Sequence, residues 1–107
     1  HGVMSKTFYI TRYGNTILEK NLTGNLYRMA FNADLEYLWT QEKTHIKRCR
    51  HLIPYLKRGI RLLTEYPEKF KQMNPPNEQD SYDVLLAAAK EILSVCEAHP
   101  MCKVQSR

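Results

Sequence analysis

The fold is decided by residues 44–66, which read THIKRCRHLIPYLKRGIRLLTEY. Apolar residues recur there at spacings of three and four, which is the period of one face of an α-helix. They are Ile46, Cys49, Ile53, Leu56, Ile60 and Leu63. Pro54 lacks a backbone donor, so we expect a kink or a restart there. The pattern predicts one long helix over 44–66 whose apolar stripe faces the core.

The same stretch predicts a basic face, because its Lys and Arg side chains fall outside the apolar stripe. Clustered Lys and Arg attract phosphates and acidic protein surfaces. A merely solvated face explains the same pattern. The candidate residues for binding a partner or a nucleic acid are Arg48, Arg50, Lys57, Arg58 and Arg61.

Composition predicts one small domain with a basic surface. The chain has 107 residues, 43% of them hydrophobic, and carries a net charge of +5. Residues 1–3 read as an expression scar before Met4, which leaves 4–107 as a single globular domain. No apolar run reaches the ~20 residues that span a bilayer, and the N-terminus lacks the apolar core of a signal peptide. We therefore expect a cytoplasmic protein without a membrane partner, and the sequence sets no oligomeric state.

The three cysteines predict reduced thiols. Cys49, Cys96 and Cys102 form no CxxC pair and have no histidine at zinc-finger spacing. The pattern indicates neither a disulfide framework nor a metal site, and Cys49 and Cys96 read as small core residues. We also expect no cofactor.

The other segments predict an α+β fold. Residues 7–11 read as a strand, 16–18 as a short second strand, and 101–106 as a last strand with alternating apolar residues. Helices are expected from the 21–25 region to about Asn32, over 33–39, over 67–70, and from a cap at Asp80 to Ala98. We expect a small sheet formed by the N- and C-terminal strands, 7–11 and 101–105, covered by three or four helices.

The order of several motifs resembles a family of small uncharacterised proteins common in phage and bacterial genomes. The matching positions are Asn21-Leu22-Thr23, Asn25-Leu26, Met29-Ala30, Leu38-Trp39, Ile53-Pro54, Asn74-Pro75-Pro76-Asn77, Tyr82, Cys96-Glu97, His99-Pro100 and Ser106-Arg107. Gly24 replaces a family histidine, and 78–80 replace Gly-Trp-Gly, which alters any family pocket built there. The resemblance implies a fold and a provenance. A phage source implies host modulation or counter-defence.

A second candidate site is the helix start at Asn21, Thr23, Gly24 and Asn25, where backbone N–H groups could hold a phosphate or a carboxylate. Ordinary capping explains these residues without a ligand and is the favoured interpretation. Glu78, Asp80 and Asp83 offer carboxylates for acid/base chemistry, but they also read as caps and solvated charges. No catalytic motif stands out.

Six of the seven tyrosines, interleaved with Arg and Lys, could stack on bases or fill a protein interface, but partial burial with the hydroxyl at the surface is the favoured interpretation. They are Tyr13, Tyr27, Tyr37, Tyr55, Tyr66 and Tyr82. The sequence thus predicts a small non-enzymatic binding protein that engages an acidic protein surface or a nucleotide-like anion. The alternative is a sequence-independent nucleic-acid-binding protein that uses the basic helix face.

Overall fold

Two N-terminal strands, a run of helices and a last strand make up the fold in the computed structural model, which describes residues 5–41, 44–76 and 81–107. In chain order the elements are β1 (Lys6–Arg12), β2 (Asn15–Leu22), η1 (Gly24–Leu26), α1 (Tyr27–Asn32), η2 (Glu36–Leu38), α2 (Cys49–Glu65), α3 (Pro67–Lys71), α4 (Ser81–Ala98) and β3 (Lys103–Ser106), where η marks a 3₁₀ helix. The fold is α+β, as predicted. The predicted carboxylates Glu78 and Asp80, including the Asp80 cap, lie outside the described residues.

The sheet has the order β2-β1-β3, and both pairings are antiparallel. β1 is central, and it pairs Phe8 with Ser106 and Ile10 with Val104. The prediction that the terminal strands share one sheet is therefore confirmed. β2 is longer than predicted, and it joins β1 through Tyr13 and Gly14, which both have positive φ (51° and 82°). Two such residues form the tight turn that suits the twist of a β-hairpin.

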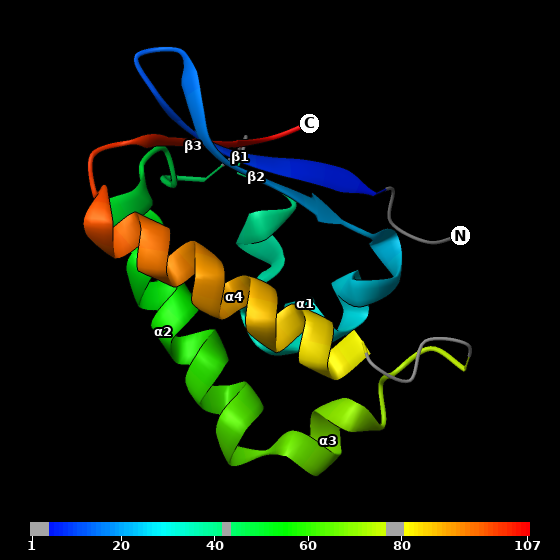
Figure 1. Cartoon of the computed structure of the whole chain (residues 1–107). Helices are drawn as coiled ribbons and strands as arrows, with labels where there is room; N and C mark the ends of the chain where they lie inside the picture. Colours follow the sequence, from blue (N-terminus) through cyan, green and yellow to red (C-terminus); the bar gives the residue numbers. More distant parts are fainter. Residues whose placement is uncertain (1–4, 42–43, 77–80) are drawn as a thin grey trace.

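The helices lie on one side of the sheet, and α2 and α4 run next to each other (Figure 1). Phe8 and Ile10 are fully buried and face these helices. α4 buries the side predicted for it: Leu85, Ala88, Ala89, Ile92 and Cys96. Asp83 lies in its first turn, and its side chain is exposed. The core thus lies between the inner face of the sheet and the α2–α4 layer.

The predicted start of the long helix is wrong, because α2 begins at Cys49 instead of Thr44. The segment before it pairs with β3: the Lys47 carbonyl accepts from the N–H of Val104 (3.2 Å), and Arg48 forms an antiparallel bridge with Lys103. These hydrogen bonds override the helical periodicity of the sequence. Ile46 is nevertheless buried, as predicted. α2 then continues through Pro54 without the restart that was also considered.

The buried stripe of α2 is rotated from the predicted one. It contains Cys49, Leu52, Leu56, Gly59 and Leu63, whereas Ile53 and Ile60 are only partly buried at its flank. Gly59 is central, because a Cβ there would lie 2.5 Å from Leu35 Cγ. α2 therefore approaches the 33–35 segment more closely than any side chain at position 59 would allow.

A side chain of α4 donates a hydrogen bond to a backbone carbonyl in the last turn of α2. Pro67 begins α3 and has no N–H, so it cannot donate to the Leu63 carbonyl one turn earlier. The Tyr82 hydroxyl donates to that carbonyl instead, at 2.5 Å. The predicted short helix after Pro67 is confirmed, with the proline at its first position.

The predicted helix from the 21–25 region is shorter than expected. β2 extends to Leu22, a 3₁₀ turn follows, and α1 covers only Tyr27–Asn32. Residues 33–39 contain only η2 as a helical element. The predicted inward positions are nevertheless correct, since Leu35, Leu38 and Trp39 are all buried.

Candidate anion-binding site

Two hollows lie side by side at the hairpin end of the molecule. The first, of about 400 Å³, lies along β3 and is lined by Gln41, residues 46–48, Thr11 and residues 103–106. The second, of about 520 Å³, lies between the hairpin turn and residues 98–103. Thr11, Arg48 and Lys103 line both, so the two hollows form one continuous surface.

Backbone pairing explains why these three residues meet. Thr11 of β1 pairs with Lys103 of β3, and Lys103 also bridges to Arg48. The Arg48 guanidinium is anchored, because its Nη1 donates to the Met101 carbonyl at 2.7 Å. A guanidinium has five N–H donors, so this one contact leaves donors for an anion.

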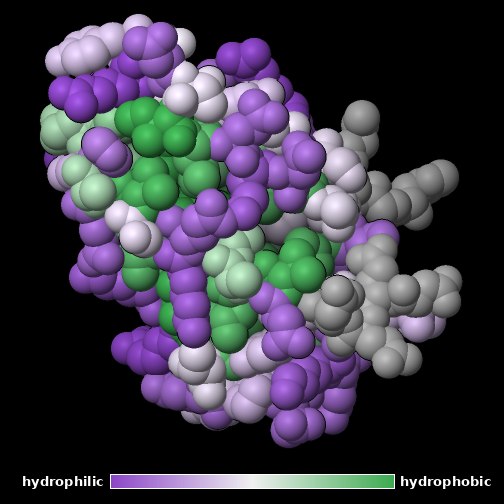
Figure 2. Space-filling view, in the orientation of Figure 1, coloured by the Kyte–Doolittle hydropathy of each residue, from purple (hydrophilic) through white to green (hydrophobic). Residues whose placement is uncertain are grey.

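Four cations border the hollows: Arg12, Lys47, Arg48 and Lys103. We call this surface, the two hollows with these four residues, the basic end. Among the described residues that line it, none is acidic. In Figure 2 hydrophilic residues cover the hairpin at the top of the view. An anion at the basic end would therefore meet only positive and neutral groups.

His51 lies beside the basic end, and its pKa is lowered from the usual value. It is lowered by burial first and then by Arg50, His45 and Arg48. The neutral ring is the form that the structure uses, because its Nδ1 accepts from the backbone N–H groups of Lys47 and Arg48, both at 3.1 Å. These two bonds fix the segment that carries two of the four cations of the basic end.

The predicted binding residues on α2 do not form one site. Arg48 lies at the basic end, Arg50 and Arg61 are exposed farther along the helix, and about 20 Å of helical rise separates positions 48 and 61. Lys57 lies 3.7 Å from a Glu97 carboxylate oxygen. Arg58 Nε lies 2.7 Å from Asp34 Oδ2. These two ion pairs offset part of the charge that the sequence assigned to a docking face.

The predicted ligand site at residues 21–25 is occupied by the protein's own groups. The Gly24 N–H donates to the Ser5 hydroxyl at 3.2 Å, and Asn21, in β2, accepts from the Thr7 hydroxyl at 3.2 Å. Thr23 precedes η1 without a side-chain capping bond, and Asn25 is an exposed residue of η1. The backbone donor that was expected to hold an anion is thus already bonded within the fold.

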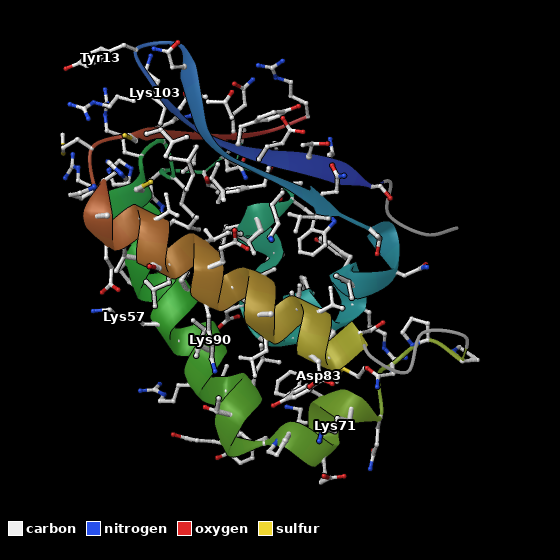
Figure 3. The ribbon with its side chains drawn as sticks, in the orientation of Figure 1. Tyr13, Lys57, Lys71, Asp83, Lys90 and Lys103 are labelled. Atoms are coloured by element: carbon white, nitrogen blue, oxygen red, sulfur yellow. The ribbon has the colours of Figure 1, made fainter. Side chains whose placement is uncertain are left out.

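Sequence reasoning missed most of the basic end. Arg12 and Lys103 were not named as candidate site residues, and as a site residue Tyr13 was considered only among six tyrosines. Tyr13 is 93% exposed, and the Arg12 guanidinium lies 5.6 Å from its ring centroid. Tyr13 and Lys103 lie at the same end of the molecule, opposite Lys71 and Asp83 (Figure 3). The Tyr-Gly turn between two strands was the one signal that could have drawn attention to this tip.

Comparisons with protein-family models, with curated proteins and with solved structures found no match for this chain. The resemblance drawn from the sequence motifs therefore stays a prediction. Within the described part of the chain, no helix is long and apolar enough to cross a membrane. In that same part, no cluster of three His, Cys, Asp or Glu residues could hold a metal ion.

Proposed function

We propose that this protein binds an anionic partner through the basic end. The observation that carries the proposal is the meeting of Arg12, Lys47, Arg48 and Lys103 around two connected hollows whose described lining contains no carboxylate. Cations held on a fixed backbone bind phosphates or carboxylates with little further ordering cost.

The proposal keeps the predicted class of function and moves its location. The sequence placed the docking surface along α2, but Lys57 and Arg58 already have acidic partners there. Exposed ion pairs contribute little to stability, yet each lowers the local attraction for an external anion. The basic end has no acidic residue in its described lining, so it attracts an external anion more strongly than the exposed face of α2 does.

The wider predictions remain part of this proposal. A non-enzymatic role and a cytoplasmic location are predictions from the sequence, and a phage origin with a host-modulating or counter-defence activity is what the resemblance implies. The three buried free cysteines are in keeping with a reducing compartment.

A polyanion titration tests the proposal. The probe is long-chain inorganic polyphosphate, and the variant reverses Arg12, Lys47 and Lys103 to Glu. The matched control reverses Arg28, Arg61 and Lys90, which are also exposed and remove the same charge. Lys90 lies along α4, away from the hairpin (Figure 3).

We expect the basic-end variant to lose at least about tenfold in affinity at low salt, with a log–log salt slope shallower by roughly one per contact removed. The control variant should keep most of the affinity. Equal losses in the two variants would mean that only net charge matters, and would overturn the assignment of the basic end. An absence of polyphosphate binding in the unmodified protein would overturn the function itself.

A further inference from the structure

The outer face of the sheet is open. Phe8 and Ile10 of β1 point into the core, so the alternating residues Thr7, Tyr9 and Thr11 point the other way. These three are all partly exposed, and the helices lie on the opposite side of the sheet (Figure 1). No described helix covers this face.

Tyr9 lies at the centre of the open face. It is on the middle strand, and its neighbours across the sheet are Glu19 on β2 and Gln105 on β3. The Arg107 guanidinium lies 5.0 Å from the Tyr9 ring centroid. Arg107 is held beside Thr7 by two backbone hydrogen bonds of 2.9 and 3.0 Å. A flat aromatic ring with a cation on it is a surface on which a nucleobase stacks.

Groups that can bond to bases and phosphates surround Tyr9. Gln105 has both a donor and acceptors, and Glu19 accepts from base amino groups. The cations Lys103 and Arg107 are both on the β3 side, whereas the acidic Glu19 is on the β2 side. A phosphate backbone would therefore follow β3 while the bases turn toward Tyr9.

The open face and the basic end are continuous. Thr11 and Lys103 pair across β1 and β3, lie on the outer face, and also line both hollows. Beyond Thr11, β1 leads to Tyr13 in the hairpin turn, which is about 13 Å along the chain from Tyr9 at the usual rise per residue. A strand of nucleotides could thus contact Tyr9, Lys103 and the exposed Tyr13 ring in turn.

We propose that the anionic partner is a single-stranded nucleic acid, with a base stacked on Tyr9 and its phosphates on Lys103, Arg107 and the basic end. This inference rests on the proposed function and names its partner. A duplex keeps its bases stacked inside, so it cannot use the Tyr9 ring, and an acidic protein has no base to place on it. The partly exposed Tyr9 ring, with cations on the β3 side of it, therefore favours single strands.

The test compares four probes: a labelled 12-nucleotide single strand of mixed, non-self-complementary sequence, its duplex, polyphosphate and poly-L-glutamate. The key variant is Tyr9→Leu, which keeps an apolar side chain on β1 but removes the ring. Tyr9→Phe retains the ring, and Tyr66→Leu is the matched control, since Tyr66 is 53% exposed and follows the far end of α2.

We expect the unmodified protein to bind the single strand more tightly than the duplex. Tyr9→Leu should weaken single-strand binding by about fivefold or more, the loss typical of one base–aromatic stack, and leave polyphosphate binding unchanged. Tyr9→Phe and Tyr66→Leu should both bind like the unmodified protein. If Tyr9→Leu does not fold, the double variant Lys103→Glu/Arg107→Glu replaces it, and it should weaken single-strand binding by at least tenfold.

The outcomes separate the two proposals. Unchanged single-strand binding by Tyr9→Leu, or by the double variant in its place, overturns the nucleic-acid inference while polyphosphate binding at the basic end still stands. Equal affinity for single strand and duplex overturns it as well. Tighter binding of poly-L-glutamate than of the single strand identifies an acidic protein as the partner and also overturns it. Failure of every probe overturns both proposals.

Discussion

Gly59→Ala is expected to destabilise the fold, although alanine is the better helix former. In an open helix the change would stabilise by about 1 kcal/mol. Here the added Cβ would lie 2.5 Å from Leu35 Cγ and Cδ2 and 2.8 Å from the Ala33 carbonyl oxygen. Overpacking of a core costs about 1–3 kcal/mol, and the upper end applies because one neighbour is backbone. We expect a net loss of about 2 kcal/mol, which lowers Tm by roughly 10 °C.

Thermal unfolding followed by circular dichroism measures this loss, and a double-mutant cycle locates it. Leu35→Ala removes both side-chain atoms that the new Cβ would meet, so Gly59→Ala should cost about 1 kcal/mol less in that background. Arg61→Ala, on the exposed side of the same helix, should change stability by less than about 0.5 kcal/mol. A Gly59→Ala protein more stable than the unmodified one would refute the close approach of α2 to residues 33–35.

Three further predictions follow from hydrogen bonds inside the fold. His51 has a lowered pKa in the folded state, so below about pH 6.5 the unfolded chain takes up the proton first and the stability of the fold decreases. Between pH 7.5 and pH 5 the Tm of His51→Gln should therefore fall less steeply than the Tm of the unmodified protein. Parallel Tm curves for the two proteins would contradict this. Tyr82→Phe leaves the Leu63 carbonyl without its donor and should cost about 1–3 kcal/mol in urea denaturation; an unchanged midpoint would show that water replaces the hydroxyl. Gln41→Leu removes the acceptor of the buried Ser106 N–H and should cost about the same, with faster amide exchange at Ser106 as its signature; exchange as slow as in the unmodified protein would contradict it.

The sheet was predictable because its signals are local. Residues 7–11 combine β-branched and aromatic side chains, and 101–106 alternate apolar with polar ones. Two terminal strands with unpaired edges are stabilised most simply by each other, and the pairing of Phe8 with Ser106 shows that they are. The buried side of α4 was predictable for the same reason, since its apolar residues follow one helical period.

α2 was harder to predict because distant residues decide its ends and its orientation. Residues 44–48 fit a helical period, but the N–H of Val104, far along the chain, donates to the Lys47 carbonyl, and the Cys102 carbonyl accepts from the N–H of Cys49 where the helix begins. The buried stripe is centred on Gly59, a residue that a count of apolar side chains ignores. Periodicity identified the helix, and tertiary contacts set where it begins and which side it buries.

The candidate site could not be predicted from a count of charges. The sequence shows Arg58 and Lys57 but not the Asp34 and Glu97 that neutralise them. It also shows Tyr9 on a strand, but which face of that strand is covered depends on the position of the helices. A charge pattern along one helix was visible in the sequence, whereas a cationic surface assembled from three separate segments was not.

The pairing of β1 with β3 has a consequence for the order of folding. The hairpin of β1 and β2 uses neighbouring residues and can form early, but its central strand keeps one edge open until β3 arrives from the other end of the chain. Such long-range pairings are slow to form, and on the ribosome this one must wait until residues 103–106 are synthesised. Both hollows depend on β3, because β3 carries Lys103 and pairs with the segment that carries Arg48. A nascent chain that lacks β3 therefore lacks the binding surface and does not compete for the partner.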